Sequence, residues 1–374
     1  MFDEPIRVMF IYWGRRGLTQ FAMEAMSAAL KNSRLSPTIS VSRQNESFAK
    51  FQSFGSHVFP VDTFSRSPGA VTQAWQVPAL RRRFAKRLQR DHTQVVIELM
   101  PHVWFPFVSP IVQAAGTRYA TIVHDAESHP GDYRTKIAKG LLDKSLKQAD
   151  IVLTLSSAVA SRLLVSGRVP TTKLFTLYHP SLNFNATGLP PYPSPGVPFR
   201  LMFMGRIMDY KGLPLFVDMA EQLREHGMPV EIGVFGEGNL GSYAQKLHEL
   251  SAEVINRWLT NEEIGRALSS YHAMVLSHTE ASQSGVAAAA LGAGMPVIAT
   301  PVGGLVEQIQ PGINGFLAQR CDASALAEAA RMLLLNRQLY ESVCRNTELH
   351  RVSISMDRFV EDCVSHALFG GSPD

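Results

Sequence analysis

Two cations that follow an apolar run are the residues whose types and spacing most directly indicate chemistry. In the stretch FMGRIMDYKG, residues 203–212, Arg206 and Lys211 lie five positions apart, and each is next to a glycine. If the apolar run is a strand and Gly212 opens a helix, both cations and the helix amino terminus meet at one point. This arrangement suits a phosphate or diphosphate group. A solvated loop with two surface cations would give the same ten letters.

A second glycine-rich turn follows the next apolar run. The segment FGEGN, residues 235–239, places Gly236 and Gly238 where a strand is expected to end. Glycines at such a turn let the backbone approach a ligand. A simple helix-capping turn explains the pair nearly as well.

The stretch LSHTEASQSGVAAAALGAGMPVIATPVGGLVEQI, residues 276–309, carries the strongest pattern. One carboxylate, Glu280, stands in the loop after an expected strand, and small residues then lead into an alanine-rich helix. The first amides of that helix have no partner within the helix and can bind a ligand. Amides suit phosphate oxygens and a carboxylate suits sugar hydroxyls, so the pattern predicts a ligand that is anionic and rich in hydroxyls.

Alternating strands and helices must position these loops. Short apolar runs, each followed by a segment of helical period, predict parallel sheets whose two faces are covered by helices. Sheets of this kind bind ligands at the carboxyl ends of their strands. The expected strands are VMFIYW, VVIELM, YATIV and DIVLTL in the first half, and RLMFM, VEIGVF, AMVL and PVIAT in the second.

A proline-rich stretch divides the chain. Residues 185–199 carry five prolines and interrupt the alternation, which is typical of an interdomain linker. We expect an amino-terminal domain over residues 1–188 and a second domain over 189–354. A last helix at about 355–370 either packs back on the first domain or stays on the second.

At this point the chain resembles a known family, the retaining nucleotide-sugar glycosyltransferases of glycosyltransferase family 4. The motifs GRIMDYKG, SHTE, GAGMPVIATPVGGLVEQI and PGINGFL carry the resemblance in order, over about residues 199–335, and it extends more faintly over the first domain. It implies the α/β architecture called GT-B, in which two doubly wound Rossmann-like domains face each other across a cleft.

The resemblance implies roles for single residues of the second domain. Arg206 and Lys211 would hold the donor diphosphate, and Glu280 would meet the hydroxyls of the donor sugar. The second glutamate of the family signature would fall at 288 or 289, where this chain has alanine, so the ribose contact is unassigned. Further donor-side residues are Gly205, Gly236, Gly238, Ser282, Gln283, Ser284, Gly285 and Val286.

In the first domain, the turn WGRRGLTQ follows the first expected strand. By the resemblance Gly14 and Gly17 lie near the donor phosphate and the acceptor, and Arg15 or Arg16 would meet an anionic acceptor. His124 matches the family histidine that faces the donor sugar, although a lone histidine at a strand end is often purely structural. Lesser candidates beside it are Asp125 and His129.

Composition excludes several other classes. The chain has 374 residues and a net charge of +4, well below the charge density of a dedicated nucleic-acid binder. Its three cysteines are far apart, which indicates neither a disulfide framework nor a zinc site and fits a reducing cytoplasm. We find no signal peptide and no apolar segment of spanning length. No Asp-x-Asp pair is present, so we predict that no metal and no cofactor besides the nucleotide-sugar co-substrate, UDP- or GDP-linked, is required.

The stretch ALRRRFAKRLQR, residues 79–90, predicts an amphipathic basic helix. Six cations fall within ten residues, and Leu80, Phe84 and Leu88 recur every four. It is either a surface helix with its apolar stripe in the core or a patch that docks on anionic lipid at the inner face of the cytoplasmic membrane.

Three functions remain in competition. The first is a retaining GT-B enzyme that transfers a sugar to a glycan or lipid-linked glycan. The second is a degenerate sugar-nucleotide-binding module without turnover, which the missing second glutamate suggests. The third, a Rossmann oxidoreductase, is disfavoured because no GxGxxG follows the first strand.

Overall fold

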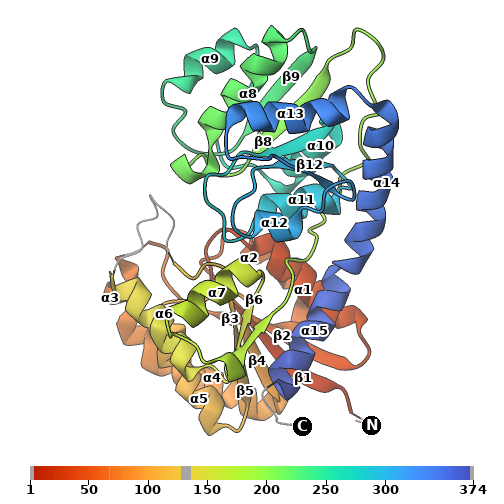
Figure 1. Cartoon of the computed structure of the whole chain (residues 1–374). Coiled ribbons are helices and arrows are strands. Elements are labelled where there is room, and N and C mark those ends of the chain that lie inside the picture. Colours follow the sequence, from red (N-terminus) through yellow and green to blue (C-terminus); the bar gives the residue numbers. More distant parts are fainter. Residues whose placement is uncertain (1–3, 67, 128–135, 371–374) are drawn as a thin grey trace. The chain divides into compact units, whose positions relative to one another are not determined.

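The computed structural model describes residues 4–66, 68–127 and 136–370 (Figure 1). The chain forms two compact units. Among the described residues, unit 1 comprises the chain up to Tyr178 together with the segment from Met356, and unit 2 comprises His179–Ser355. The chain therefore passes into unit 2 before the proline-rich stretch begins.

Unit 1 is built on a parallel sheet. Its described part has seven strands in the order β3-β2-β1-β4-β5-β6-β7, so the winding reverses between β1 and β4. β1 pairs in register with β2, Ile6 opposite Leu35, and with β4, Val8 opposite Val95. The strands are β1 (Ile6–Tyr12), β2 (Leu35–Ser42), β3 (Val58–Val61), β4 (Val95–Glu98), β5 (Arg118–Val123), β6 (Ile151–Thr154) and β7 (Leu174–Thr176).

Helices connect these strands and cover the sheet. They are α1 (Thr19–Lys31), α2 (Phe48–Phe51), η1 (Gln52–His57), α3 (Gly69–Thr72), η2 (Ala74–Gln76), α4 (Val77–Asp91), η3 (Phe105–Phe107), α5 (Ser109–Ala114), α6 (Lys136–Gln148), α7 (Ser157–Val165), η4 (Thr171–Lys173) and the carboxyl-terminal α15 (Met356–Phe369).

The carboxyl-terminal helix α15 packs on unit 1, although it follows unit 2 in the chain. Its Phe359 meets Phe21 of α1 edge to face, with ring centroids 5.5 Å apart. Asn32 donates a hydrogen bond to Glu361 at 2.9 Å, and Arg118 of β5 donates one to the Gly370 carbonyl at 2.8 Å. The last helix thus contributes to the amino-terminal core.

Helix α4 places its apolar stripe in the core of unit 1. Leu80, Phe84 and Leu88 are all buried, and Phe84 packs against Trp13 and Phe105. Of the two interpretations of the basic helix, the structure therefore supports a surface helix with a buried apolar stripe. Its cationic face is what remains for any contact with a membrane.

The described part of unit 2 is built on a second parallel sheet, with six strands in the order β10-β9-β8-β11-β12-β13 and the reversal between β8 and β11. The strands are β8 (Phe199–Met204), β9 (Val230–Phe235), β10 (Glu253–Ile255), β11 (Ala273–Leu276), β12 (Val297–Ala299) and β13 (Gly315–Leu317). The helices are η5 (Asp209–Lys211), α8 (Leu213–Glu225), α9 (Tyr243–Glu249), α10 (Asn261–Ser270), α11 (Gly285–Gly292), α12 (Leu305–Gln308), α13 (Ala323–Leu334) and α14 (Arg337–Ser353).

The proline-rich stretch lies against unit 2. The Pro190 and Pro191 carbonyls contact the side chains of Tyr340 and His272 at 3.2 and 3.1 Å. Tyr192 packs on Phe199, the first residue of β8. Proline removes backbone donors but keeps its carbonyls, so an extended proline-rich segment can still be fixed by side-chain donors.

Both units are doubly wound α/β domains, so the predicted pair of Rossmann-like domains with parallel sheets is confirmed. The burial of the strands explains the near-continuous apolar runs in the sequence, because helices cover both faces of such a sheet. No helix within the described residues has the length and apolar character needed to cross a membrane.

Candidate functional site

The carboxyl ends of three neighbouring strands of unit 2 hold most of the predicted donor-side residues. Gly205 follows β8, Gly236 follows β9, and Ser277 follows β11, and these strands are adjacent in the order β9-β8-β11. Arg206 extends from the first of these loops and is exposed, whereas Glu280 in the third is half-buried. The sheet topology thus brings Arg206, Lys211 and Glu280 to one edge of one sheet.

The glycines after β8 and β9 are required because their backbones pack against each other. A Cβ atom at Gly236 would lie 2.0 Å from the Gly205 carbonyl oxygen, and one at Gly238 would lie 2.3 Å from that of Ile207. Gly205 itself has a φ of +115°. Close packing between the two loops is therefore sufficient by itself to demand glycine at positions 236 and 238. Ligand contacts by Gly205, Gly236 and Gly238 remain predictions.

The loop with Lys211 is joined to the loop with Glu280. The Thr279 amide donates to the Tyr210 carbonyl at 2.9 Å, and the Ser277 hydroxyl donates to the Lys211 carbonyl at 3.2 Å. Gly212 adopts a φ of +69°, and a Cβ atom there would lie 1.8 Å from the Ser277 carbonyl oxygen. The two predicted motifs, GRIMDYKG and SHTE, are therefore one packed unit of structure.

His278 is a residue of this site that the sequence pattern did not single out. Its side chain is buried, and its Nε2 atom lies 2.8 Å from the Lys211 ammonium nitrogen. A lysine ammonium group has only donors, so the imidazole nitrogen accepts this hydrogen bond. The Thr300 hydroxyl donates to the His278 carbonyl at 2.5 Å, which fixes the loop from its other side.

The start of α11 is held by α12. The Ser284 hydroxyl accepts a hydrogen bond from the Ala287 amide at 3.2 Å and so caps the helix. The Ser284 amide donates to the Gln308 side chain at 2.7 Å, and the Gln308 amide nitrogen donates back to the Ser284 carbonyl at 3.2 Å. Gln308 was not among the predicted site residues. It holds Ser284, which lies 24 residues earlier in the chain.

The remaining predicted donor-side residues lie along the same segment. Ser282 is buried, Gln283 is half-buried, and Gly285 is exposed at the first turn of α11. The Val286 side chain approaches Gly205, with its Cγ2 atom 3.1 Å from where a Cβ of that residue would be. The structure thus places Val286 beside the loop after β8.

In unit 1, the turn after β1 is held by the loop after β2. Asn45 donates a hydrogen bond to the Gly14 carbonyl at 2.7 Å. Arg15 and Arg16 both form ion pairs with Glu46, at 2.8 and 2.5 Å. The Arg16 guanidinium donates to the Glu46 carboxylate and, with Arg15, holds the pKa of that group below its ordinary value. Gly17 follows with a φ of +67°.

His124 directly follows β5 of unit 1 and is buried. Its Nε2 atom lies 2.8 Å from the Leu99 carbonyl oxygen, which can only accept, so Nε2 carries the proton. Its ring also meets Phe21 edge to face, with centroids 5.7 Å apart. Asp125, the next residue, is half-buried, and His129 lies outside the described residues.

Glu98 is a buried carboxylate at the end of β4 that the sequence pattern did not single out. It accepts hydrogen bonds from the Tyr119 and Thr121 hydroxyls at 2.7 and 2.9 Å and from the His102 amide at 2.9 Å. Burial raises the pKa of Glu98 to about 7 despite these donors. The group thus ties the loop after β4 to strand β5.

Comparison with known proteins identifies the domain that carries the donor-side residues. Residues 198–336 match the family described as glycosyl transferases group 1. The matched residues lie in unit 2. The predicted resemblance to nucleotide-sugar glycosyltransferases of family 4 is therefore confirmed.

Curated relatives match this chain over less than half its length. The 2-deoxystreptamine N-acetyl-D-glucosaminyltransferase of Niallia circulans is 28% identical over 170 residues, which cover 44% of this chain and 42% of the relative. WcaL of Salmonella typhimurium, a candidate colanic acid biosynthesis glycosyltransferase, is 25% identical over 164 residues, 40% of either chain. The matched segment thus spans about two fifths of these relatives.

Solved structures match this chain over nearly its whole length. HepE of Anabaena in complex with UDP-glucose has a TM-score of 0.72 at 14% identity and covers 96% of this chain and 99% of its own. The sucrose-phosphate synthase of Thermosynechococcus elongatus has a TM-score of 0.71 at 14% identity, with 98% and 100% covered. The likeness extends over both units and confirms the GT-B fold.

Proposed function

We propose that this protein transfers a sugar, with retention of the anomeric configuration, from a nucleoside diphosphate sugar to a glycan or lipid-linked glycan. The observation that carries the proposal is the single sheet edge of unit 2 at which Arg206, Lys211 and Glu280 gather. UDP is favoured over GDP because HepE, whose fold is similar, was crystallised with UDP-glucose.

In this proposal the cations stabilise the leaving group. Arg206 and Lys211 face the diphosphate, whose negative charge grows as the glycosidic bond to the nucleotide breaks. Hydroxyls of the donor sugar donate hydrogen bonds to the Glu280 carboxylate, which orients the anomeric carbon. The leaving phosphate assists deprotonation of the acceptor hydroxyl on the same face, so no residue is assigned as a nucleophile.

The two side-chain cations supply the positive charge that a divalent ion supplies in other transferases. We therefore propose that transfer is independent of metal. Activity that persists in EDTA supports this proposal, whereas activity restored only by added Mg²⁺ or Mn²⁺ would contradict it.

We assign the acceptor to the carboxyl edge of the unit 1 sheet, near residues 14–17, 124 and 125. His124 can meet a sugar hydroxyl only through Nδ1 while its Nε2 proton is donated to Leu99. The proposed location is cytoplasmic, at the inner face of the membrane. Because the apolar stripe of α4 is buried, membrane contact through residues 79–90 would rest on charge, from Arg81, Arg82 and Lys86.

A degenerate sugar-nucleotide-binding module is the second candidate. Ala288 and Ala289 occupy the positions where a second glutamate is expected, and both are buried in α11. No carboxylate from these positions reaches a ribose. If the protein is such a module, we expect it to bind the nucleotide without sugar transfer and without slow hydrolysis of the donor.

The deciding experiment measures binding and turnover together. Calorimetry with UDP, GDP and ADP in EDTA is followed by a hydrolysis assay with the sugar forms of the nucleotide that binds. We expect UDP to bind wild type and to lose at least tenfold in affinity with Arg206→Ala or Lys211→Ala. Binding with donor hydrolysis supports a transferase, binding alone supports the module, and no binding by any nucleotide contradicts both.

A further inference from the structure

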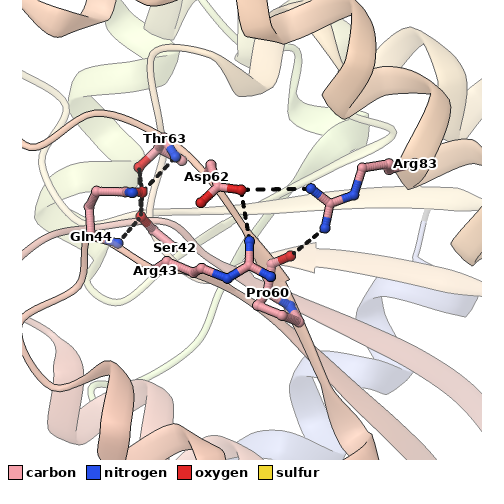
Figure 2. Close-up of polar contacts among 7 residues, drawn as sticks. All are labelled: Ser42, Arg43, Gln44, Pro60, Asp62, Thr63 and Arg83. Carbon is pink, nitrogen blue, oxygen red and sulfur yellow. Dashed lines mark hydrogen bonds and ion pairs between the residues drawn. The ribbon is translucent and has the colours of Figure 1, made fainter.

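Unit 1 holds two pairs of arginines, and each pair shares one carboxylate. In the first, Arg15 and Arg16 from the loop after β1 both contact Glu46. In the second, Arg43 and Arg83 both contact Asp62, as Figure 2 shows. We call these four arginines, with Glu46 and Asp62, the arginine cluster.

The second pair joins three elements of unit 1. Arg43 follows β2, Asp62 follows β3, and Arg83 comes from α4. The Arg43 Nη1 atom lies 2.7 Å from Asp62 Oδ2, and the Arg83 Nη1 atom lies 3.7 Å from the same oxygen. Arg83 also donates to the Pro60 carbonyl at 3.1 Å, which fixes its direction (Figure 2).

A buried polar layer holds this pair in place. The Ser42 and Thr63 hydroxyls are 2.6 Å apart, and the Gln44 side-chain oxygen accepts from the Thr63 amide at 2.7 Å. Ser42 and Thr63 are buried. Their sequence neighbours Arg43 and Asp62 point outward, because successive side chains of an extended chain alternate between its two faces. The hydrogen bonds among Ser42, Gln44 and Thr63 therefore fix the backbone that carries Arg43 and Asp62 (Figure 2).

The two pairs are physically connected. The Arg15 Nη1 atom donates to the Ser65 carbonyl at 3.1 Å, so the first pair touches the loop that carries Asp62. The loops involved follow β1, β2 and β3, which are neighbours in the sheet. The cluster thus lies at the carboxyl edge of unit 1, where sheets of this kind bind ligands.

The charges of the second pair do not balance. The Arg43 and Arg83 guanidinium groups share one carboxylate, that of Asp62, which leaves one positive charge on side chains that are 40 and 48% exposed. Two guanidinium groups offer ten N–H donors, more than one carboxylate can accept. Arginine forks bind phosphate oxygens in pairs, so a phosphate group fits this surplus of charge and donors.

We infer that the arginine cluster binds a phosphate or diphosphate group of the acceptor, with Arg43 and Arg83 as its principal ligands. Asp62 occupies the two guanidinium groups in the free protein and is displaced when the phosphate binds. The inference rests on the proposed function, because it assigns a chemical class to the acceptor of that reaction. The phosphate belongs either to a phosphorylated saccharide or to a lipid headgroup.

The test uses inorganic pyrophosphate as the probe and the full chain. The donor site also attracts this anion, so all proteins carry Arg206→Ala and Lys211→Ala, and binding is measured by calorimetry. We expect Arg43→Gln with Arg83→Gln to weaken pyrophosphate binding about tenfold or more. The matched control is Arg331→Gln with Arg337→Gln, which removes two ion-paired arginines, one half-buried in α13 and one exposed in α14.

A third variant changes affinity in the opposite direction. Asp62→Asn removes the competing carboxylate, and we expect pyrophosphate to bind about threefold more tightly. The inference is wrong if the Arg43 and Arg83 variant binds like the control, if Asp62→Asn weakens binding, or if the protein with a disabled donor site binds no pyrophosphate. Because Asp62 is partly exposed, its variant is expected to fold even where the arginine variants do not.

Sedimentation with vesicles identifies the source of the phosphate. Vesicles of phosphatidylcholine are compared with vesicles that contain phosphatidic acid. If the acidic vesicles bind wild type but not the Arg43 and Arg83 double variant, the phosphate is that of a lipid headgroup. If they bind neither protein, a phosphorylated saccharide is the ligand. A separate titration of UDP into wild type tests the proposed function, and its failure would leave the pyrophosphate result standing.

Discussion

The Lys211 ammonium nitrogen lies 2.8 Å from the Nε2 atom of His278, a buried imidazole in the loop after β11. The contact links two loops that are 67 residues apart in the chain. Lysine is a flexible point charge, so a fixed acceptor restricts where its ammonium group can be. His278 therefore positions the cation that we assign to the donor diphosphate.

We expect His278→Leu to weaken UDP binding about tenfold, since a hydrogen bond to a charged group contributes about 1.5–3 kcal/mol. His278→Gln retains an acceptor and is expected to stay within about threefold of wild type. Calorimetric titration of UDP checks both variants. In the Lys211→Ala background the leucine variant should have no further effect, and a full additional loss there would show that His278 acts independently of Lys211.

Sequence patterns predicted the parts of this site that depend on local order. Glycines beside cations, a carboxylate before an alanine-rich helix and the alternation of strands and helices are all local features. The tertiary partners of these residues could not be predicted in that way. His278 and Gln308 are ordinary polar residues in the sequence, and only the packing of loops from different strands gives them their roles.

The fold of unit 1 shows the same limit. β2 was not among the expected strands because Pro37 and three serines interrupt its apolar pattern, yet it pairs with β1 along seven residues. Ser40 and Ser42 are buried in it because their hydroxyls find partners in Trp13 and Thr63. Polar residues in a strand are tolerated inside a core when tertiary contacts satisfy them.

Glu98 is expected to make the folding stability of the protein decrease as pH rises. Burial raises its pKa from the ordinary value of 4.5 to about 7. An acid whose pKa is higher in the folded state binds more protons there than in the unfolded chain, so its contribution to stability is lost as pH rises from about 4.5 to about 7. Glu98→Gln resembles the protonated acid and lacks this dependence.

Denaturant unfolding of wild type and Glu98→Gln at pH 5, 6, 7 and 8 measures the effect, because other titrating groups cancel in the difference. We expect the glutamine variant to gain about 3 kcal/mol relative to wild type between pH 5 and pH 8. A difference that does not vary with pH would show that Glu98 is ionised throughout this range in the folded protein.

Gln308 is expected to matter for binding although it lies 24 residues from the segment that it holds. Its side chain makes two hydrogen bonds with the Ser284 backbone at the start of α11. Gln308→Ala leaves the Ser284 amide and carbonyl without these partners, which costs about 1–3 kcal/mol. Thermal unfolding and UDP titration check the prediction, with Gln310→Ala as the nearby control. Equal behaviour of the two variants would contradict it.

Gly212 offers the sharpest test of how the two donor-side loops pack. It and Gly227 share a left-handed backbone, with φ of +69° and +73°, so alanine at either position costs about 1–2 kcal/mol in strain. At Gly212 the new Cβ atom would also lie 1.8 Å from the Ser277 carbonyl oxygen, whereas at Gly227 it would meet nothing within 4 Å.

The loop with Lys211 must therefore move away from Ser277 in Gly212→Ala. We expect that variant to lose at least tenfold in UDP affinity and Gly227→Ala to bind UDP as wild type does, with both melting temperatures lowered. Loss of UDP affinity in both variants would point to strain alone as the cause.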